Sequence, residues 1–230
     1  FLTELREITR ARGVVLIFDE VVTGFRVSGG GAQGHYGVRP DLTSLAKILA
    51  GGLPGGAVCG CADILELLDF DVAAAKGFEK IGHQGTYNAN PMSAAAGITA
   101  LSVIREIKAW ETANRQAGKL RQACNEVFAS EGVSWACYGE FSGFYFFMNP
   151  DGIELDPLSF DPGRVGHAAL SKKSALAERL RLALLVNGVD IAGKPGGSVS
   201  AAHTDADIEE TASALRAAVA LIREDGSVLQ

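Results

Sequence analysis

A continuous run of apolar side chains at residues 14–18 constrains the fold most, because an acidic residue, Asp19, follows it directly. The run is rich in β-branched residues and does not alternate between apolar and polar, which is typical of a parallel strand covered on both faces. Parallel strands belong to α/β proteins, in which the carboxyl ends of the strands form the edge where ligands bind. The sequence therefore predicts an α/β fold with Asp19 at that edge.

A single lysine follows the next apolar segment. Lys47 comes directly after residues 42–46 and precedes a glycine-rich turn at 51–56. Because its neighbours are apolar, we expect its aliphatic stem to be enclosed, which would lower the pKa of its amine towards neutrality. An amine and a carboxylate at two strand ends suit pyridoxal phosphate (PLP), since the lysine can hold the aldehyde as a Schiff base while the acid keeps the pyridinium nitrogen protonated. The alternative interpretation of Lys47 is a solvated surface lysine.

Composition excludes several other classes of protein. The chain has 230 residues, of which 47% are hydrophobic and 28 are glycine, as in a loop-rich α/β protein with a real core. The net charge is −6 and both signs are spread along the chain, so we expect no nucleic-acid partner. No apolar stretch reaches the length of a membrane span and the N-terminus does not read as a signal peptide, so we expect a cytoplasmic protein that does not bind a membrane.

The cysteines and histidines show no spacing typical of a metal site. We expect the cysteines to be reduced core thiols, without a disulfide or zinc site. His35, His83 and His167 are likewise not spaced as ligands. His203 could suggest a catalytic dyad, but no G-x-S-x-G motif accompanies it, so helix capping is the preferred interpretation. The four cysteines are Cys59, Cys61, Cys124 and Cys137.

Periodicity and capping signals predict two domains, residues 1–108 and residues 109–230. In the first we expect helices at 1–12, 62–68 and 91–108, strands at 14–18, 42–46 and 57–60, and loops at 23–40 and 79–90. In the second we expect helices at 115–130, 174–186 and 205–223, antiparallel strands at 133–138 and 143–148, a surface loop at 149–166, and a short strand at 199–200. Thr204 and Asp207 form a capping signal before the last helix.

One glycine-rich segment matches a dinucleotide-binding motif by its letters. Residues 29–34 read G-x-G-x-x-G, but this fingerprint needs a strand directly before it and a helix directly after it. The predicted strand ends ten positions earlier, and residues 35–40 do not favour the start of a helix. We therefore interpret this segment as a flexible surface loop, and a dehydrogenase is a distant alternative.

Three segments of the chain resemble the class III aminotransferases of fold type I, and within them the glutamate-1-semialdehyde 2,1-aminomutase-like branch. The segments are residues 16–26, residues 40–57 and residues 85–91. The resemblance implies the C-terminal part of a fold type I large domain followed by a small α+β C-terminal domain. It also implies that the glycine-rich phosphate cup and the ring-stacking aromatic residue belong to an N-terminal half of the family fold that this sequence does not show, so we expect a fragment or a short subunit.

The same resemblance assigns roles to four residues. Asp19 would pair with the pyridine nitrogen of PLP, and Val21 would pack against one face of the ring. Lys47 would form the Schiff base and then move a proton on the substrate. Thr86 would reach the cofactor phosphate of a neighbouring subunit, which implies a homodimer with a shared active site. The expected substrates are an amino acid and a keto acid or semialdehyde.

Two departures from the family bear on the reaction. Many class III transaminases have glutamine at the position of Val22, whereas the aminomutase-like branch has an apolar residue there. Aminomutases have a Phe-Glu pair where this chain has Lys194 and Pro195. We therefore favour an aminotransferase, with the aminomutase as one alternative and an inert fragment that needs a complementing N-terminal half as another. Arg26 could contact a substrate carboxylate, although a surface salt bridge is the simpler role.

Overall fold

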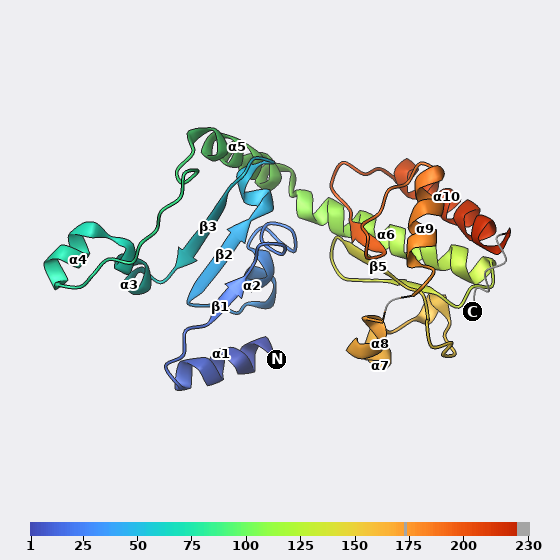
Figure 1. Ribbon diagram of the computed structural model, residues 1–230, viewed down its shortest axis with the longest axis horizontal. Coiled ribbons are helices and arrows are strands. Elements are labelled where there is room, and N and C mark those ends of the chain that lie inside the picture. Colours follow the sequence, from blue (N-terminus) through green and yellow to red (C-terminus); the bar gives the residue numbers. More distant parts are fainter. Residues whose placement is uncertain (173, 225–230) are drawn as a thin grey trace. The chain divides into compact units, whose positions relative to one another are not determined.

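The computed structural model describes residues 1–172 and 174–224 (Figure 1). The chain divides into two compact units, Phe1–Trp110 and Glu111–Gln230, which we call unit 1 and unit 2. Each unit has its own three-stranded sheet. Within the described residues, no helix combines the length and the apolar composition that a bilayer span requires.

The sheet of unit 1 has the order β1-β2-β3. Strands β1 (Ile17–Asp19) and β2 (Leu42–Ala46) are parallel, and Asp19 pairs in register with Ser44. Strand β3 (Gly56–Gly60) runs antiparallel to β2. The predicted α/β arrangement is confirmed, and both β1 and β2 end at the same edge of the sheet.

A long helix, α5 (Pro91–Ile107), packs on the turn that follows β2. The Asn90 side chain accepts hydrogen bonds from the amides of its first turn, which explains why the helix begins there. The turn after β2, on which α5 packs, is the 3-10 helix η1 (Lys47–Ala50). A Cβ atom on Gly97 would lie 2.5 Å from the carbonyl oxygen of Leu49, so a side chain at this position would prevent the close approach of helix and turn. The glycine therefore allows α5 to approach the turn closely.

The remaining helices of unit 1 are short. They are α1 (Leu2–Ala11), α2 (Gly31–Tyr36), α3 (Ala62–Leu65), η2 (Glu66–Leu68) and α4 (Phe70–Lys76). Helix α2 lies inside the segment that the sequence predicted to be a loop, so that prediction is wrong in part. Its first turn is stabilised by the carboxylate of Glu20, which is distant in sequence and therefore invisible to a local pattern.

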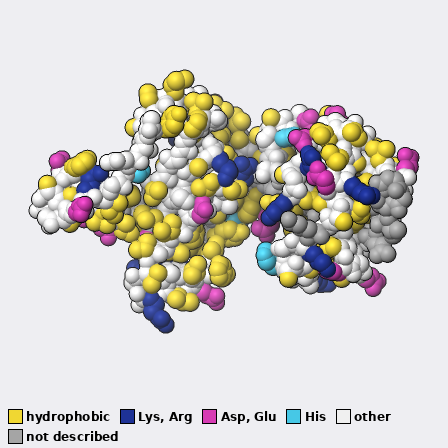
Figure 2. Space-filling view, viewed as in Figure 1, with side chains coloured by type: hydrophobic (Ala, Val, Ile, Leu, Met, Phe, Trp, Pro, Cys, Tyr) yellow, Lys and Arg dark blue, Asp and Glu magenta, His cyan; other side chains and the backbone are white. Residues whose placement is uncertain are grey.

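The predicted burial of the first strand on both faces is also wrong. Leu16 is buried, but Val14, Val15 and Ile17 are 54%, 50% and 57% exposed. The reason is that β1 forms an edge of its sheet, and no element among the described residues covers the face that carries Ile17. Figure 2 shows many hydrophobic side chains on the surface of unit 1.

Unit 2 combines an antiparallel sheet of order β4-β5-β6 with three longer helices. The strands are β4 (Ala136–Tyr138), β5 (Gly143–Phe147) and β6 (Gly196–Ser198), and the helices are α6 (Ala109–Ser130), α9 (Ala177–Val186) and α10 (Asp205–Glu224). Shorter helices are η3 (Pro157–Ser159), α7 (Pro162–Val165) and α8 (His167–Leu170). The predicted antiparallel pair is confirmed, whereas α6 begins six residues early and β6 lies just before the predicted strand.

Apolar side chains from these elements form one continuous core. Phe128, Trp135, Leu180 and Leu215 are fully buried in it. The ring of Phe128 lies edge-on to the ring of Trp135, with centroids 5.8 Å apart. Two cysteines are core thiols as predicted, Cys124 and Cys137, whereas Cys59 is exposed and Cys61 is half-buried; all four are free.

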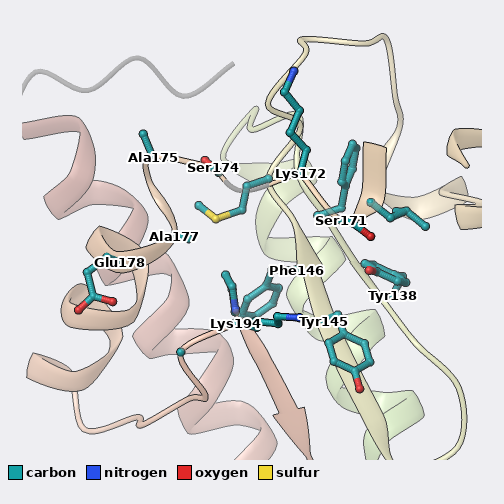
Figure 3. A pocket seen from close by; sticks show the side chains of 15 residues that line it. Tyr138, Tyr145, Phe146, Ser171, Lys172, Ser174, Ala175, Ala177, Glu178 and Lys194 are labelled. Atoms are coloured by element: carbon teal, nitrogen blue, oxygen red, sulfur yellow. The ribbon is translucent and has the colours of Figure 1, made fainter. Parts of the chain in front are cut away.

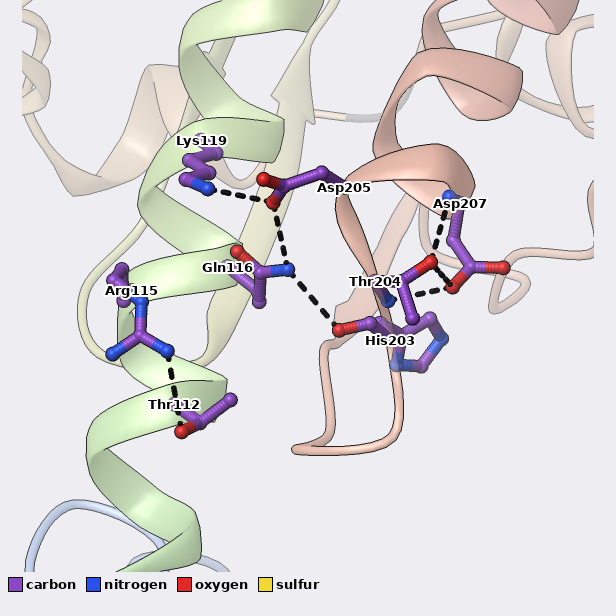
Figure 4. Close-up of polar contacts among 8 residues, drawn as sticks. All are labelled: Thr112, Arg115, Gln116, Lys119, His203, Thr204, Asp205 and Asp207. Atoms are coloured by element: carbon purple, nitrogen blue, oxygen red, sulfur yellow. Dashed lines mark hydrogen bonds and ion pairs between the residues drawn. The ribbon is translucent and has the colours of Figure 1, made fainter.

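The start of α10 confirms the predicted capping signal (Figure 4). The carboxylate of Asp207 accepts hydrogen bonds from the amide and the hydroxyl of Thr204, at 2.6 and 2.7 Å. The side-chain amide of Gln116 donates to Asp205 and to the carbonyl oxygen of His203, which ties α6 to this end of α10. The ring of His203 accepts from a backbone amide in the preceding turn, so its ring supports the turn and does not cap the helix.

Candidate active site

Asp19 is the last residue of β1, and its carboxylate is held in one orientation. Its Oδ1 atom accepts hydrogen bonds from the amide of Val21 at 3.1 Å and from the hydroxyl of Ser44 at 3.2 Å. Ser44 is its register partner on β2, so the parallel pairing brings the hydroxyl to the carboxylate. Within the described part of the chain, the second oxygen, Oδ2, has no hydrogen-bond partner, and the side chain is exposed. Asp19 therefore offers one oriented, accessible acceptor.

Lys47 lies directly after β2, at the first position of η1. Its φ angle is +52°, in the left-handed region that side chains other than glycine rarely adopt. Such strain is concentrated at functional positions. The expected enclosure of its stem is wrong, because Lys47 is exposed. The reason is that η1 packs on α5, β2 and β3, and none of these elements covers the lysine.

The two strand ends bring Asp19 and Lys47 to the same edge of the sheet. Ser44, which is in register with Asp19, lies three positions before Lys47. Among the described residues, Lys47 forms no hydrogen bond and no ion pair, with Asp19 or with any other acid. The site therefore combines an unpaired amine with an oriented carboxylate.

Glu20 is a structural residue that sequence reasoning missed. It is only 1% exposed, and its carboxylate accepts hydrogen bonds from Thr23 at 2.8 Å and from the amides of Ala32 and Gln33 at 2.7 and 2.8 Å. Successive side chains of an extended segment point to opposite faces, so the adjacent acids diverge. Only Asp19 stays available to a ligand. This alternation at residues 19 and 20 was the signal that could have separated the two roles.

The same contact decides how the G-x-G-x-x-G segment is used. A dinucleotide phosphate would need the free amides at the start of a helix. In this chain the first turn of α2 already donates those amides to Glu20. A Cβ atom at Gly31 would lie 2.3 Å from a carboxylate oxygen of Glu20, so the glycine is needed for this close approach. The dinucleotide alternative therefore finds no support in the geometry.

The structure also places the other residues that the sequence predicted to be functional. Val21 follows Asp19 and is half-buried. Thr86 is exposed in the segment before α5, and in the described residues no hydrogen bond joins it to Asp19 or Lys47. Arg26 donates from Nε to the carbonyl oxygen of Val22 at 2.9 Å and forms no ion pair with the described residues, contrary to the salt bridge expected for it.

Asp19 and Lys47 fit PLP at its ring nitrogen and its aldehyde. The free Oδ2 of Asp19 can accept a hydrogen bond from a protonated pyridine nitrogen, and the unpaired amine of Lys47 can serve as the covalent anchor. Ser44 adds a contact that the sequence analysis did not foresee, because only the register of the strands reveals it.

Comparison with known proteins agrees with this geometry. The sequence profile of the family "Aminotransferase class-III" matches residues 1–134, which is more than half of the chain. The chain belongs to the class III aminotransferases. Enzymes of this family depend on PLP, so the predicted cofactor is confirmed for the family.

Solved structures of class III aminotransferases and related enzymes have the same fold. An ω-transaminase from Sphaerobacter thermophilus is 33% identical with a TM-score of 0.78, covering 96% of this chain and 48% of that chain. A transaminase with PLP bound is 29% identical with a TM-score of 0.79, covering 98% and 48%. A glutamate-1-semialdehyde aminomutase from Pseudomonas aeruginosa PAO1 is 23% identical with a TM-score of 0.74, covering 96% and 47%. The predicted fold type I resemblance is confirmed, and this class III chain spans about half the length of the chains that it matches.

Proposed function

We propose that this chain forms part of a PLP-dependent aminotransferase that moves an amino group from a small amino acid to a keto acid or aldehyde. The observation that carries the proposal is that Asp19 and Lys47 both lie at the carboxyl ends of two adjacent parallel strands. The carboxylate is held by Ser44 and leaves one oxygen free, and the amine is unpaired within the described residues. Membership of the class III family supports the same reaction class.

Each residue has a chemical task in this proposal. Bound PLP supplies an electron sink for the charge that develops on the substrate carbon. Asp19 would accept a hydrogen bond from the protonated ring nitrogen and so keep it protonated, and Ser44 keeps the carboxylate in position. Lys47 anchors the cofactor and then acts as general base and acid at the substrate Cα. Val21 would pack against one face of the ring.

Quaternary structure and location remain part of the proposal. Thr86 is assigned to the cofactor phosphate of a neighbouring subunit, and this assignment makes the enzyme a homodimer with a shared active site. The exposure of Thr86 and the absence of a hydrogen bond to Asp19 or Lys47 in the described residues are compatible with a role across an interface. We place the enzyme in the cytoplasm, since its four cysteines are free.

The intramolecular alternative, an aminomutase, is less well supported. The residues where aminomutases carry a Phe-Glu pair are Lys194 and Pro195, directly before β6. No carboxylate stands there to assist an amino shift on a semialdehyde. Production of 5-aminolevulinate from glutamate-1-semialdehyde without an added amino acceptor would favour the aminomutase over our proposal.

The test is a near-visible absorbance spectrum of the purified chain with PLP, before and after borohydride reduction, followed by peptide mapping. We expect a reducible band and a label on Lys47. Lys47→Ala should lose both the band and transaminase activity. Lys76→Ala is the matched control, because Lys76 is an exposed lysine of unit 1 that pairs with Glu66.

Three results separate the alternatives. A label on another lysine, or activity that survives in Lys47→Ala, would contradict the role of Lys47. A band that forms only after a polypeptide with the other half of the family fold is added would support the complementation hypothesis. No band under either condition would overturn the proposed cofactor site.

A further inference from the structure

Unit 2 contains a pocket of about 680 Å³, which lies in the range of small-molecule sites (Figure 3). It is lined by β4 and β5, by the segment that leads into α9, and by residues directly before β6. Figure 3 shows Lys194 and Phe146 in the middle of the view, with Tyr138 and Tyr145 to one side and Glu178 to the other. These segments are far apart in sequence, so the pocket exists only in the folded unit.

Four aromatic side chains and a methionine contribute to the lining of this pocket. Phe146 and Met148 are buried, with 8% and 5% exposure, and contribute an apolar floor. The rings of Tyr138 and Tyr145 lie 5.8 Å apart and form a side wall. Aromatic faces and a thioether make favourable contacts with a planar apolar group. The pocket is therefore suited to a ligand with an aromatic body.

Among the described residues that line the pocket, Lys194 is a cation without a partner. Lys172 forms an ion pair with Asp151. The carboxylate of Glu178 accepts from Arg181 at 3.1 and 2.8 Å. Lys194, by contrast, has neither a hydrogen bond nor an ion pair among the described residues. Because these other described charges are paired, Lys194 is the described lining residue whose positive charge is left to attract an anion.

Tyr138 adds a hydrogen-bond donor to the same space. Burial is the main cause that raises the pKa of its phenol, with the neighbouring Tyr145 adding to the effect. The hydroxyl therefore keeps its proton at neutral pH and can donate to an anion. A donor and an unpaired cation in a pocket with an apolar floor are the groups that recognise a carboxylate attached to an apolar body.

We propose that this pocket of unit 2 binds an organic anion with an aromatic body, whose carboxylate pairs with Lys194. The inference rests on unit 2 alone, so it does not depend on the PLP site proposed for unit 1. It assigns Lys194 and the aromatic wall to ligand recognition.

The experiment is calorimetric titration of the full chain, without PLP, with 3-phenylpropionate and with its neutral amide. We expect the carboxylate to bind at least tenfold more tightly than the amide. Lys194→Met should weaken carboxylate binding about tenfold and leave amide binding unchanged, whereas Lys194→Arg should retain it. Lys172→Met is the matched control at the same pocket, because its charge is already paired with Asp151; we expect at most a twofold change.

Ring proton NMR of the tyrosines locates the ligand in the same samples. Resonances of Tyr138 and Tyr145 should shift on addition of 3-phenylpropionate. Equal affinity for the acid and the amide, affinity unaffected by Lys194→Met, or shifts confined to Tyr36 and Tyr87 of unit 1 would each overturn the proposal. The NMR spectrum of ligand-free Lys194→Met should match that of the parent protein, which would show that the variant is folded. Any loss of binding is then due to the loss of the amine.

Discussion

Unit 2 buries a continuous apolar core, whereas unit 1 leaves many large apolar side chains in contact with solvent. Every residue of the main buried cluster belongs to unit 2, including Trp135 and Leu180. In unit 1, by contrast, Ile17 and Val58 are 57% and 59% exposed, although both lie on strands. A sheet is stable when another layer covers its apolar face. Unit 2 supplies that layer from its own helices, and unit 1 does not.

This difference separates the unit with the larger apolar core, unit 2, from the unit that carries the candidate active site, unit 1. The candidate active site lies in unit 1, the unit with the smaller core. Its local geometry is maintained by polar contacts, chiefly those of Asp19 and Glu20. We therefore expect unit 2 to depend on packing and unit 1 to depend on a few buried hydrogen bonds. The following predictions test that contrast.

The largest effect is expected from Phe128→Ala in unit 2. Phe128 is fully buried and contacts Trp135 and Phe146, so truncation should leave a cavity and cost about 3–5 kcal/mol of the free energy of unfolding. The measurement is urea denaturation followed by Trp135 fluorescence, in a Trp110→Phe background that silences unit 1. A loss below about 1 kcal/mol would contradict the rigid core inferred for unit 2.

Among the unit 1 variants, Glu20→Ala should cause the largest loss of stability. It leaves the amides of Ala32 and Gln33 without their acceptor, and we expect about 3 kcal/mol of destabilisation. The ring of Trp110 lies against Gly29, close to α2, so Trp110 fluorescence in a Trp135→Phe background reports this change.

Glu20→Gln is the control for this variant, since its amide oxygen retains one acceptor. It should lose less stability than Glu20→Ala. Unchanged unfolding of Glu20→Ala would show that α2 does not need the carboxylate.

Acidic pH should lower the free energy of unfolding of each unit through the protonation of a different carboxylate. The amide of Thr204 holds the pKa of Asp207 below its ordinary value of 3.8, and the amide of Leu16 does the same for Asp41. Because each pKa is lower in the folded state, the stabilisation is present above about pH 3.8 and is lost as the pH falls through the folded pKa. Urea midpoints measured from pH 6 to pH 3 should fall for the parent protein.

Asparagine variants assign this effect to its unit. Asp207→Asn should make the urea midpoint of unit 2 depend less on pH. Asp41→Asn should do the same for the urea midpoint of unit 1. A variant that flattens the curve of the other unit would contradict the assignment of these contacts.

The smallest effect is expected from Val58→Ala in unit 1. Val58 is a strand residue, yet it is 59% exposed, so we expect a change of less than about 0.5 kcal/mol. Trp110 fluorescence again gives the measurement. A loss similar to that of Phe128→Ala would show that another layer covers this face in solution, and the contrast between the units would then fail.

Strand ends could be predicted from the sequence, because apolar runs followed by polar residues mark them directly. For this reason the sequence alone predicts Asp19 and Lys47 at the ends of neighbouring strands. The capping residues Asn90 and Thr204 also act locally, and the helices that follow them begin where expected.

Contacts between distant segments could not be predicted in this way. The role of Glu20 depends on amides twelve and thirteen positions away, and that of Ser44 on the register of β1 and β2. The exposure of Lys47 depends on which elements surround its turn, although its neighbours in sequence are apolar. The pocket around Lys194 is assembled from segments that share no sequence motif.

The left-handed backbone conformation of Lys47 affects which substitutions this position would favour. Glycine adopts a φ of +52° without strain, whereas a residue with a side chain pays about 1 kcal/mol or more. Folding alone would therefore favour glycine at this position. A chain that did not need the amine would gain stability by replacing Lys47 with glycine, so the role proposed for Lys47 is what would weigh against that replacement.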